Sequence, residues 1–184
     1  MAINLYPHQQ DALSRMKNGC ILNGGVGSGK SITGLAYYFT QEGGSIEPYS
    51  PMSNPKDLYI ITTAQKRNTM EWEKELSHFL LTTNPEVAYY KNKVIVDSWN
   101  NIGKYSNVTD GWFVFDEQRV CGYGAWTKSF LKIAKSNRWI LLSATPGDCW
   151  LDYVPVFIAN GFYKNKTEFT REVLPPFFNE IFRR

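Results

Sequence analysis

The chain has 184 residues with a formal net charge of +3, and 43% of its residues are hydrophobic and 20% charged. That length suits one domain with a sizeable core and is too short for two full-sized α/β domains with a linker. The composition is near the average of globular proteins, which excludes a disordered chain or a fibrous repeat. The mildly basic charge is compatible with a nucleic-acid partner but does not argue for one.

The cysteines and the amino-terminal residues narrow the choice of compartment. Cys20, Cys121 and Cys149 form no C-x-x-C pair, so the sequence predicts neither a zinc site nor a disulfide framework. The first residues lack the basic segment and apolar run of a secretory signal, and no apolar stretch approaches the ~20 residues that span a bilayer. We therefore expect a cytoplasmic protein with no membrane partner.

Short apolar runs alternate along the chain with segments of helical periodicity. The expected helices cover 6–17, 31–39 and 67–81, and the expected strands cover 20–23, 58–62, 93–97, 112–116 and 139–143. The run 41–56, rich in Gly, Ser, Pro and Asn, is expected to be a surface loop. This alternation predicts an α/β fold with a mainly parallel sheet and helices on both faces. We expect it to occupy residues 1–160, with 161–184 as a C-terminal extension or the start of a second half.

The helix expected at 67–81 is charged, but part of it can face a core. The side chains that would do so are Met70, Trp72, Leu76, Phe79 and Leu80.

Residues 24–31 read Gly-Gly-Val-Gly-Ser-Gly-Lys-Ser and satisfy the pattern G-x-x-x-x-G-K-[ST] between a predicted strand and a predicted helix. Glycines allow a tight turn whose N–H groups point at phosphates, and the helix N-terminus adds positive potential. Lys30 is expected to contact the β- and γ-phosphates of ATP, and Ser31 to place its hydroxyl on Mg²⁺. The alternative is a flexible turn that merely precedes a lysine, which the strand and helix on either side disfavour. The predicted ATP-binding residues of this P-loop are Gly25, Val26, Gly27, Ser28, Gly29, Lys30 and Ser31.

Asp116 and Glu117 follow directly after an apolar strand. Their carboxylates should therefore emerge at the carboxyl edge of the sheet, beside the P-loop. In P-loop enzymes one acid at this place holds the Mg²⁺ shell, usually through water, and a second can polarise the attacking water. We assign Asp116 to the metal and Glu117 to the water, which makes Lys30, Asp116 and Glu117 the predicted catalytic set. The alternative, a solvated acidic turn, would be a strong one only without the P-loop.

Four segments, in the right order, resemble the DExx helicases and translocases of superfamily two. Residues 5–13 (Leu-Tyr-Pro-His-Gln-Gln-Asp-Ala-Leu) resemble the element whose glutamine reads adenine, which implies Gln9, with Gln10 as its neighbour. Residues 24–31 match motif I, 116–119 (Asp-Glu-Gln-Arg) match motif II, and 141–146 (Leu-Leu-Ser-Ala-Thr-Pro) match motif III. Motif III discriminates, because a P-loop alone is shared with kinases, GTPases and transporters.

The resemblance implies a RecA-like ATP-binding domain, the first motor domain of such a protein, with ATP and Mg²⁺ as cofactors and a nucleic acid, more readily DNA than RNA, as partner. Coupling between the nucleotide and the nucleic acid would fall to Arg119, Ser143, Ala144 and Thr145. Motif II departs from the family, because Gln118 and Arg119 stand where DEAD and DEAH proteins have Ala-Asp or Ala-His. If the gene is of phage type, the protein would act in the cytoplasm of the host cell.

Two weaker matches point to the chromatin-remodeller-like branch. Residues 60–67 with 72–76 are similar to motif Ia, where a loop at the end of a strand touches the DNA backbone, and 94–100 are similar to the next such segment. Polar groups of this kind suit phosphate oxygens. The implied nucleic-acid contacts are Thr63, Lys66, Arg67, Ser98 and Trp99. For Lys66 and Arg67 the alternative of ordinary solvated charges at a helix start stays open.

Family members need a second RecA-like domain whose arginine fingers complete the ATP site, and nothing after Pro146 resembles its motifs. An arginine finger is worth ~10³ to 10⁵ in turnover, so the chain alone is expected to hydrolyse ATP slowly or not at all. We expect a motor domain of a helicase or translocase that a second domain completes in cis or in trans. The alternative is a stand-alone nucleotide-binding module with a regulatory or interaction role. A P-loop kinase or GTPase is disfavoured because Ser143-Ala-Thr has no role in it.

Overall fold

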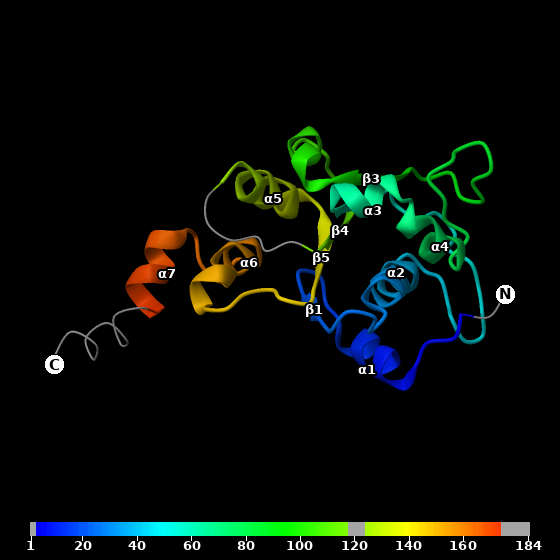
Figure 1. Ribbon diagram of the computed structural model, residues 1–184, viewed down its shortest axis with the longest axis horizontal. Helices are drawn as coiled ribbons and strands as arrows, with labels where there is room; N and C mark the ends of the chain where they lie inside the picture. Colours follow the sequence, from blue (N-terminus) through cyan, green and yellow to red (C-terminus); the bar gives the residue numbers. More distant parts are fainter. Residues whose placement is uncertain (1–2, 118–123, 174–184) are drawn as a thin grey trace.

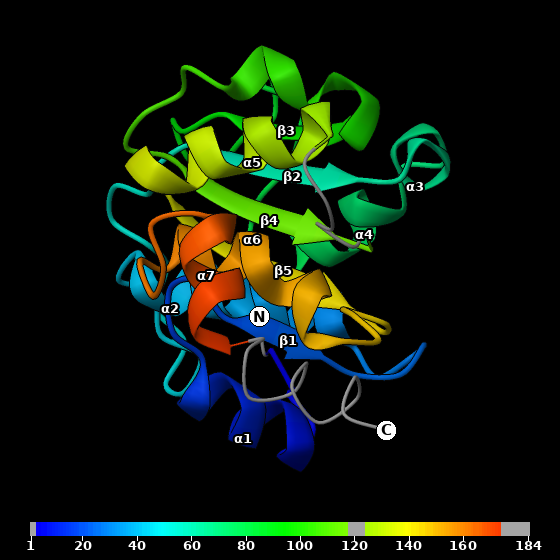
Figure 2. The same ribbon diagram turned by 90° about the vertical axis from the view of Figure 1, so that its left-hand side faces the viewer.

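The computed structural model describes residues 3–117 and 124–173, and its centre is a five-stranded sheet in which all paired strands run parallel. The strands are β1 (Ile21–Asn23), β2 (Leu58–Thr62), β3 (Val94–Ser98), β4 (Trp112–Asp116) and β5 (Arg138–Ser143). Their order across the sheet is β1-β5-β4-β2-β3, and Figure 2 shows them in that order from bottom to top. Each lies within one residue of its predicted place, and the predicted fold class is confirmed.

Helices cover both faces of the sheet, as the alternation predicts. Figure 1 shows α2 (Lys30–Gln41) and α4 (Glu71–Ser77) on one side of the strands and α5 (Ala125–Ser136) and α6 (Val154–Ala159) on the other. The remaining helices are α1 (Pro7–Arg15), α3 (Ala64–Asn68) and α7 (Lys166–Val173), with the 3₁₀ helices η1 (Trp99–Tyr105) and η2 (Trp150–Tyr153). Within the described residues, no helix has the length and apolar character needed to cross a membrane.

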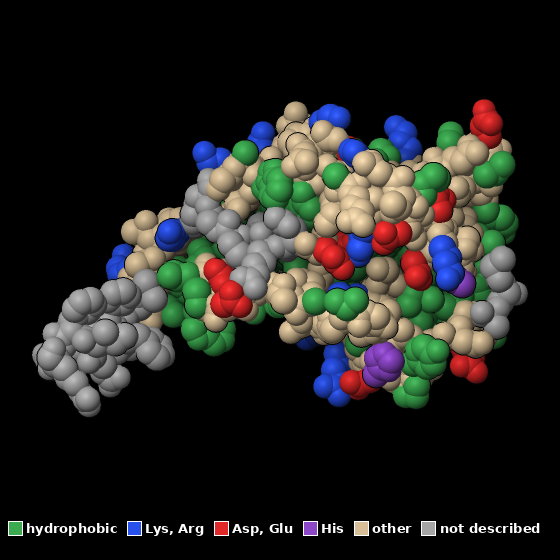
Figure 3. All heavy atoms as spheres, in the orientation of Figure 1, with side chains coloured by type: hydrophobic (Ala, Val, Ile, Leu, Met, Phe, Trp, Pro, Cys, Tyr) green, Lys and Arg blue, Asp and Glu red, His purple; other side chains and the backbone are tan. Residues whose placement is uncertain are grey.

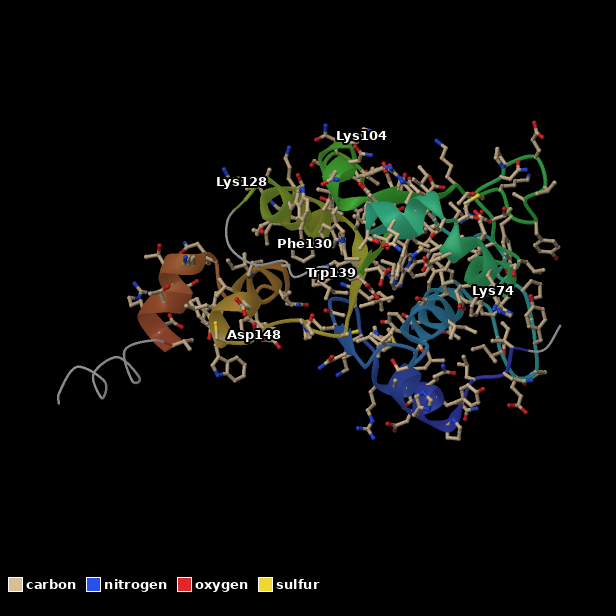
Figure 4. The ribbon with its side chains drawn as sticks, in the orientation of Figure 1. Lys74, Lys104, Lys128, Phe130, Trp139 and Asp148 are labelled. Atoms are coloured by element: carbon tan, nitrogen blue, oxygen red, sulfur yellow. The ribbon has the colours of Figure 1, made fainter. Side chains whose placement is uncertain are left out.

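The side chains of the central strands alternate between two apolar cores. In β4, Trp112 and Val114 pack on the side of α2 and α4, whereas Phe113 and Phe115 pack on the side of η1 and α5. β2 and β5 alternate in the same way, because successive side chains of a strand point to opposite faces. On the α5 side, the rings of Phe130 and Trp139 meet edge to face with centroids 5.0 Å apart (Figure 4). Two covered faces explain why these strands are almost wholly apolar.

The single helix expected at 67–81 is wrong, because two short helices take its place. Met70 adopts a left-handed conformation with φ of 55°, so α3 ends at Asn68 and α4 begins at Glu71. Met70 is 61% exposed instead of facing the core, whereas Trp72 is buried as expected. The break lets α3 lie beside the strand ends while α4 turns its apolar side onto α2.

The loop expected at 41–56 has neither helix nor regular strand apart from the first residue, which ends α2, and one isolated bridge between Ser45 and Ser50. It also contributes to the core, since Met52 is 3% exposed. At the other end of the described chain, α7 packs on α6 through stacked rings of Phe169 and Phe157, with centroids 5.9 Å apart. The division at residue 160 stays a prediction, and residues 174–184 lie outside the described part.

Candidate functional site

Every strand of the sheet ends in a polar residue. Because the strands are parallel, these ends meet at one edge, where α/β proteins bind their ligands. The last residues of β1, β5, β4, β2 and β3 are Asn23, Ser143, Asp116, Thr62 and Ser98. On the face shown in Figure 3, acidic and basic side chains lie next to one another near the centre, over the region where Figure 1 draws α3 and the end of β4. The candidate site lies along this edge.

The P-loop connects the end of β1 to the start of α2. Gly27 and Gly29 have φ of 78° and 75°, in the left-handed region that favours glycine, and Gly29 is the residue that caps α2. The Lys30 ammonium curls back into the loop, where its Nζ donates to the carbonyl oxygens of Gly24 at 2.7 Å and Gly25 at 2.9 Å. Ser31 lies in the first turn of α2, and Val26 is 94% exposed at the tip of the loop. These residues form a continuous turn of backbone before a helix N-terminus, which is the geometry a phosphate requires.

Gln9, the predicted adenine reader, lies between α1 and the P-loop. It is 5% exposed; its Oε1 accepts from the backbone N–H of Tyr6 at 2.8 Å and its Nε2 donates to the carbonyl of Ser28 at 3.4 Å. Gln10 points elsewhere, since its Nε2 donates to the carbonyl of Leu5 at 2.9 Å. A cavity of about 230 Å³ opens here, lined by His8, Gln9, Ala12, Leu22, Asn23, Gly24, Ser28, Lys30 and Thr33. The structure thus brings Gln9, rather than Gln10, to the P-loop.

Asp116 is almost fully buried and has two partners. It is 1% exposed, and its Oδ2 accepts from the Thr62 hydroxyl at 2.8 Å and from the Lys66 ammonium at 3.1 Å. Lys66 also pairs with Oε1 of Glu117 at 2.9 Å. Glu117 is exposed to a greater degree, with 39% of its side chain accessible, and has a left-handed φ of 57°. The two predicted acids therefore share one lysine.

The charges of this trio are set by burial and by one another. Burial raises the pKa of Asp116, while the charge of Lys66 and the hydrogen bonds from Thr62 and Lys66 oppose that rise. Burial alone would lower the pKa of Lys66, but Glu117 and Asp116 raise it above its ordinary value. The ammonium therefore stays charged, and it supplies the positive charge that a buried carboxylate needs.

The residues at this edge fit Mg²⁺. Hydroxyl and carboxylate oxygens are the donors that this ion prefers, and Ser31 and Asp116 offer one of each. The Lys66 ammonium between Asp116 and Glu117 acts as a stand-in cation, which shows that the site accommodates positive charge. Among the described residues, no group of three or more His, Cys, Asp and Glu side chains could hold a metal ion. The remaining ligands would have to come from phosphate oxygens and water.

Motif III lies between the two halves of the edge. β5 pairs with β1 on one side and β4 on the other, so Ser143 is next to Asn23 in the sheet and its carbonyl accepts from the backbone N–H of Gly24 at 3.3 Å. The hydroxyl of Ser143 is buried and accepts from the backbone N–H of Thr145 at 3.1 Å. Thr145 itself is exposed, and Ala144 is half-buried. Arg119, the other residue predicted to couple, lies outside the described residues.

The five residues predicted to contact nucleic acid lie at this same edge, but each has an intramolecular role. Thr63 caps α3 by accepting from the N–H of Lys66, and the Ser98 hydroxyl accepts from the N–H of Asn100. Trp99 is 3% exposed, and its indole N–H donates to the carbonyl of Asp116 at 2.9 Å. A buried indole cannot stack on a base in this conformation. The nucleic-acid contacts therefore stay predictions.

Arg67 belongs to a hydrogen-bond network around Asp97 that the sequence analysis did not predict. Its Nη1 donates to Oδ1 of Asp97 at 3.0 Å. Asp97 also accepts from the Asn101 amide at 2.8 Å, the Tyr105 hydroxyl at 2.7 Å and the N–H of Ser98 at 2.7 Å. Burial alone would raise the pKa of Asp97, but these donors lower it to about 2. Asp97 thus ties α3 to β3 and η1.

Thr62 and Asp97 are the functional candidates that sequence reasoning missed. For Thr62 the sequence shows only that it ends an apolar run. Its place beside Asp116 follows from the register of the sheet, in which Ile61 pairs with Phe115. That register is visible only once the sheet is assembled. For Asp97 no local signal exists, since its partners come from α3 and η1.

The chain has a RecA-like fold, with a parallel sheet in which the P-loop strand β1 and the acidic strand β4 flank β5, the strand that ends in Ser-Ala-Thr. The chain is similar to the Sulfolobus solfataricus SWI2/SNF2 ATPase core in complex with dsDNA, with a TM-score of 0.69 and 16% identity, covering 97% of this chain and 41% of that one. It is also similar to the Pyrococcus furiosus Hef helicase domain, with a TM-score of 0.58 and 19% identity, covering 84% of this chain and 35% of that one. No protein-family model and no curated protein matches the chain.

At the level of the fold, these likenesses confirm the RecA-like domain and the predicted resemblance to helicase and SWI2/SNF2 ATPase domains. At such low identity they speak for the fold and leave the activity to be argued from the site. The chain spans about two fifths of the length of the first structure and about a third of the second.

Proposed function

We propose that the chain is the ATP·Mg²⁺-binding first motor domain of a DNA helicase or translocase, which couples ATP hydrolysis to movement on nucleic acid when a second RecA-like domain completes it. The observation that carries this proposal is the arrangement of one sheet edge. The P-loop follows β1, the acids follow β4, and the strand between them, β5, ends in the Ser-Ala-Thr segment. Kinases and GTPases have no use for that segment in this place.

The P-loop side would bind the nucleotide phosphates. The N–H groups of residues 25–31 and the N-terminus of α2 favour an anion there, and Lys30 would exchange the carbonyl oxygens of Gly24 and Gly25 for oxygens of the β- and γ-phosphates. Gln9 would hold the adenine with the side-chain amide that now bonds to Tyr6 and Ser28. The position of Gln9 against the loop supports this role.

The acid side would supply the chemistry. Ser31 and Asp116 would hold Mg²⁺, Asp116 partly through water, and bound Mg²⁺ neutralises charge on the phosphates during transfer. Glu117, the more exposed acid, would polarise the attacking water. A carboxylate that is open to solvent suits this task better than a buried one, because the water has to reach it.

The partners proposed are a nucleic acid and a second RecA-like domain. The matched SWI2/SNF2 core was solved with dsDNA, which favours DNA as the nucleic acid. Thr63, Lys66, Arg67 and Ser98 are the contacts we propose on this domain, and Trp99 would have to leave its buried position to join them. The second domain, in cis or in trans, would contribute the arginine fingers that speed turnover by ~10³ to 10⁵.

The test is ATP binding and turnover by the chain, with and without DNA, compared with Lys30→Ala. Lys128 on α5 is exposed, so Lys128→Ala serves as a control that removes a lysine far from the loop (Figure 4). Binding that depends on Lys30, with negligible turnover until a second domain is supplied, supports the proposal. DNA-stimulated turnover by the chain alone would mean that copies of the chain assemble a complete site. Nucleotide binding with no response to DNA or to a second domain favours the stand-alone module, and binding that survives Lys30→Ala overturns the proposal.

A further inference from the structure

Lys66 occupies an unusual place for a lysine predicted to touch nucleic acid. It lies on α3, directly after β2, and its side chain is only 22% exposed. Its Nζ is 3.1 Å from Oδ2 of Asp116 and 2.9 Å from Oε1 of Glu117. The helix that carries it is fixed at its start by the Thr63 hydroxyl. One ammonium therefore sits between the two carboxylates to which the metal and the water are assigned.

The acids need such a cation. A carboxylate that is 1% exposed, next to a second carboxylate, is strongly disfavoured without a counter-charge. The lysine of the P-loop does not provide it, because Lys30 donates to the carbonyls of Gly24 and Gly25. Among the residues that the structure describes, the ion pairs of both acids are made with Lys66. Lys66 thus carries out, in this conformation, the electrostatic task that a divalent metal carries out in a nucleotide-bound P-loop enzyme.

We propose that Lys66 is a resident counter-ion that holds the place of Mg²⁺ at Asp116 and Glu117, and that it leaves when Mg²⁺ binds. The identity of the incoming ion rests on the proposed function. Both cations need the same oxygen atoms: Oδ2 of Asp116 already accepts from Thr62 and Lys66. A metal ion and an ammonium cannot both be close to that oxygen without strong repulsion. Lysine suits an exchange because its charge is carried on a flexible four-carbon stem and can swing away.

The exchange predicts a competition that can be measured without nucleotide. Mn²⁺ takes the same oxygen ligands as Mg²⁺ and can be followed by its electron paramagnetic resonance signal. Lys66→Met shortens the side chain by one atom and removes its charge, so we expect its Mn²⁺ dissociation constant to fall by about tenfold relative to the unaltered chain. Lys66→Arg keeps a charge beside the acids and should bind Mn²⁺ no more tightly than the unaltered chain does.

Two controls locate the effect. Lys74 is an exposed lysine on the neighbouring helix α4 (Figure 4), and Lys74→Met should leave Mn²⁺ binding unchanged. Adding Asp116→Asn to Lys66→Met should remove the gain in affinity, because the gain depends on that carboxylate. If Lys66→Met binds Mn²⁺ with equal or lower affinity than the unaltered chain, Lys66 does not compete with the metal and the proposal is overturned.

Thermal unfolding tests the same idea if Lys66→Met weakens the fold. In EDTA this variant leaves Asp116 and Glu117 without their cation, so its melting temperature should fall below that of Lys74→Met. Mn²⁺ should then raise the melting temperature of Lys66→Met more than it raises that of the unaltered chain. A loss of stability that Mn²⁺ does not reverse would show that Lys66 is a purely structural ion-pair partner, and would refute the exchange.

These measurements separate the exchange from the proposed function. If ATP binding does not depend on Lys30 but Mn²⁺ affinity still rises in Lys66→Met, the proposed function fails and competition at the acids stands. If ATP binding depends on Lys30 but Mn²⁺ affinity is the same in both chains, the proposed function stands and the exchange fails.

Discussion

The P-loop side of the carboxyl edge is built from the backbone of one continuous segment, whereas the acid side is built from side chains that meet across the sheet. On the P-loop side, the Lys30 ammonium bonds to carbonyls five and six residues away. On the acid side, Thr62 reaches Asp116 across 54 positions of sequence and Lys66 reaches it across 50. The difference matters because backbone geometry is fixed by local residue types, while a side-chain network needs the finished fold.

Substitutions on the two sides should therefore destabilise the domain for different physical reasons. A substitution in the P-loop acts through backbone conformation, which few residues can adopt. A substitution on the acid side acts through the charge or hydrogen bond left without a partner.

The largest effect is expected at Gly29. Its φ is 75°, and a Cβ placed there would lie 2.1 Å from Nε2 of Gln9. Gly29→Val should lower the free energy of unfolding by about 3 kcal/mol, chiefly because a β-branched residue is strained at this φ, and should abolish nucleotide binding because the amide of Gln9 has to move away from the loop. Chemical denaturation and nucleotide titration measure the two effects.

Gly25 in the same loop is the matched control, because a Cβ there would meet nothing within 4 Å and its φ is not in the left-handed region. Gly25→Val should change the free energy of unfolding by less than about 0.5 kcal/mol. Equal stability of the two variants would mean that the loop is not held in the observed conformation. Backbone conformation would then not be what builds the P-loop side.

On the acid side, the next largest effect is expected at Asp97. Asp97→Asn keeps the shape of the side chain but removes its negative charge. The carboxylate that is lost pairs with Arg67 and accepts hydrogen bonds from Asn101 and Tyr105. The free energy of unfolding at neutral pH should fall by about 2 kcal/mol, as for a charged hydrogen-bonding partner that is lost. Denaturation of Asp97→Asn measures it, and Glu86→Gln, at an exposed glutamate of the loop before β3, is the comparison. An effect no larger than that of Glu86→Gln would contradict the network.

The difference in the free energy of unfolding between the unaltered chain and Asp97→Asn should depend on pH, and its direction follows from the pKa of Asp97. The pKa of Asp97 is lowered from its ordinary value of 3.8 to about 2 in the fold, chiefly because hydrogen bonds outweigh burial. A group with a lowered pKa adds stability that is present above the unfolded pKa and lost as pH falls through the folded pKa. The advantage of the unaltered chain over Asp97→Asn should therefore be constant above about pH 5 and shrink towards pH 2. A difference that stays constant down to pH 2 would assign the stability to shape instead of charge.

The same division explains what could be read from the sequence. The strands at 58–62 and 112–116 have their predicted bounds, because an unbroken apolar run between polar residues fixes a doubly covered strand locally. The P-loop can likewise be predicted from the sequence, since its glycines and Lys30 lie within one short segment. The turn at Met70 was missed because a left-handed methionine has no local signature and is imposed by where α3 and α4 must lie. The sharing of Lys66 by both acids depends on a loop after β2 meeting the end of β4.

A smaller effect is expected at Thr62, which is fully buried and donates its hydroxyl hydrogen to Asp116. Thr62→Val has nearly the same shape, so only the hydrogen bond is lost, and the free energy of unfolding should fall by about 1 kcal/mol. Thr69→Val, at an exposed threonine between α3 and α4, should cost less.

Thr62→Val and Lys66→Met are expected to be coupled, because both side chains bond to the same oxygen of Asp116. Their effects on unfolding should not add, since the second change acts on a carboxylate already weakened by the first. Additive effects, measured by denaturation of both single variants and the double variant, would mean that the acid side is a set of separate contacts and not one network.

The smallest effect is expected for an ion pair on the P-loop side, between Arg15 and Asp11 on α1. Nη2 of Arg15 and Oδ1 of Asp11 are 2.8 Å apart, closer than Nη1 of Arg67 and Oδ1 of Asp97 at 3.0 Å. However, 77% of the Arg15 side chain and 58% of the Asp11 side chain are exposed. Water and salt screen such a pair, so Arg15→Ala should change the free energy of unfolding by about 0.5 kcal/mol or less. Arg67→Ala, which leaves a mostly buried Asp97 without its cation, should cost several times more. Comparable losses for the two arginines in the same denaturation series would show that distance, and not burial, sets the strength of ion pairs in this domain. Burial would then not strengthen the ion pairs of the acid side.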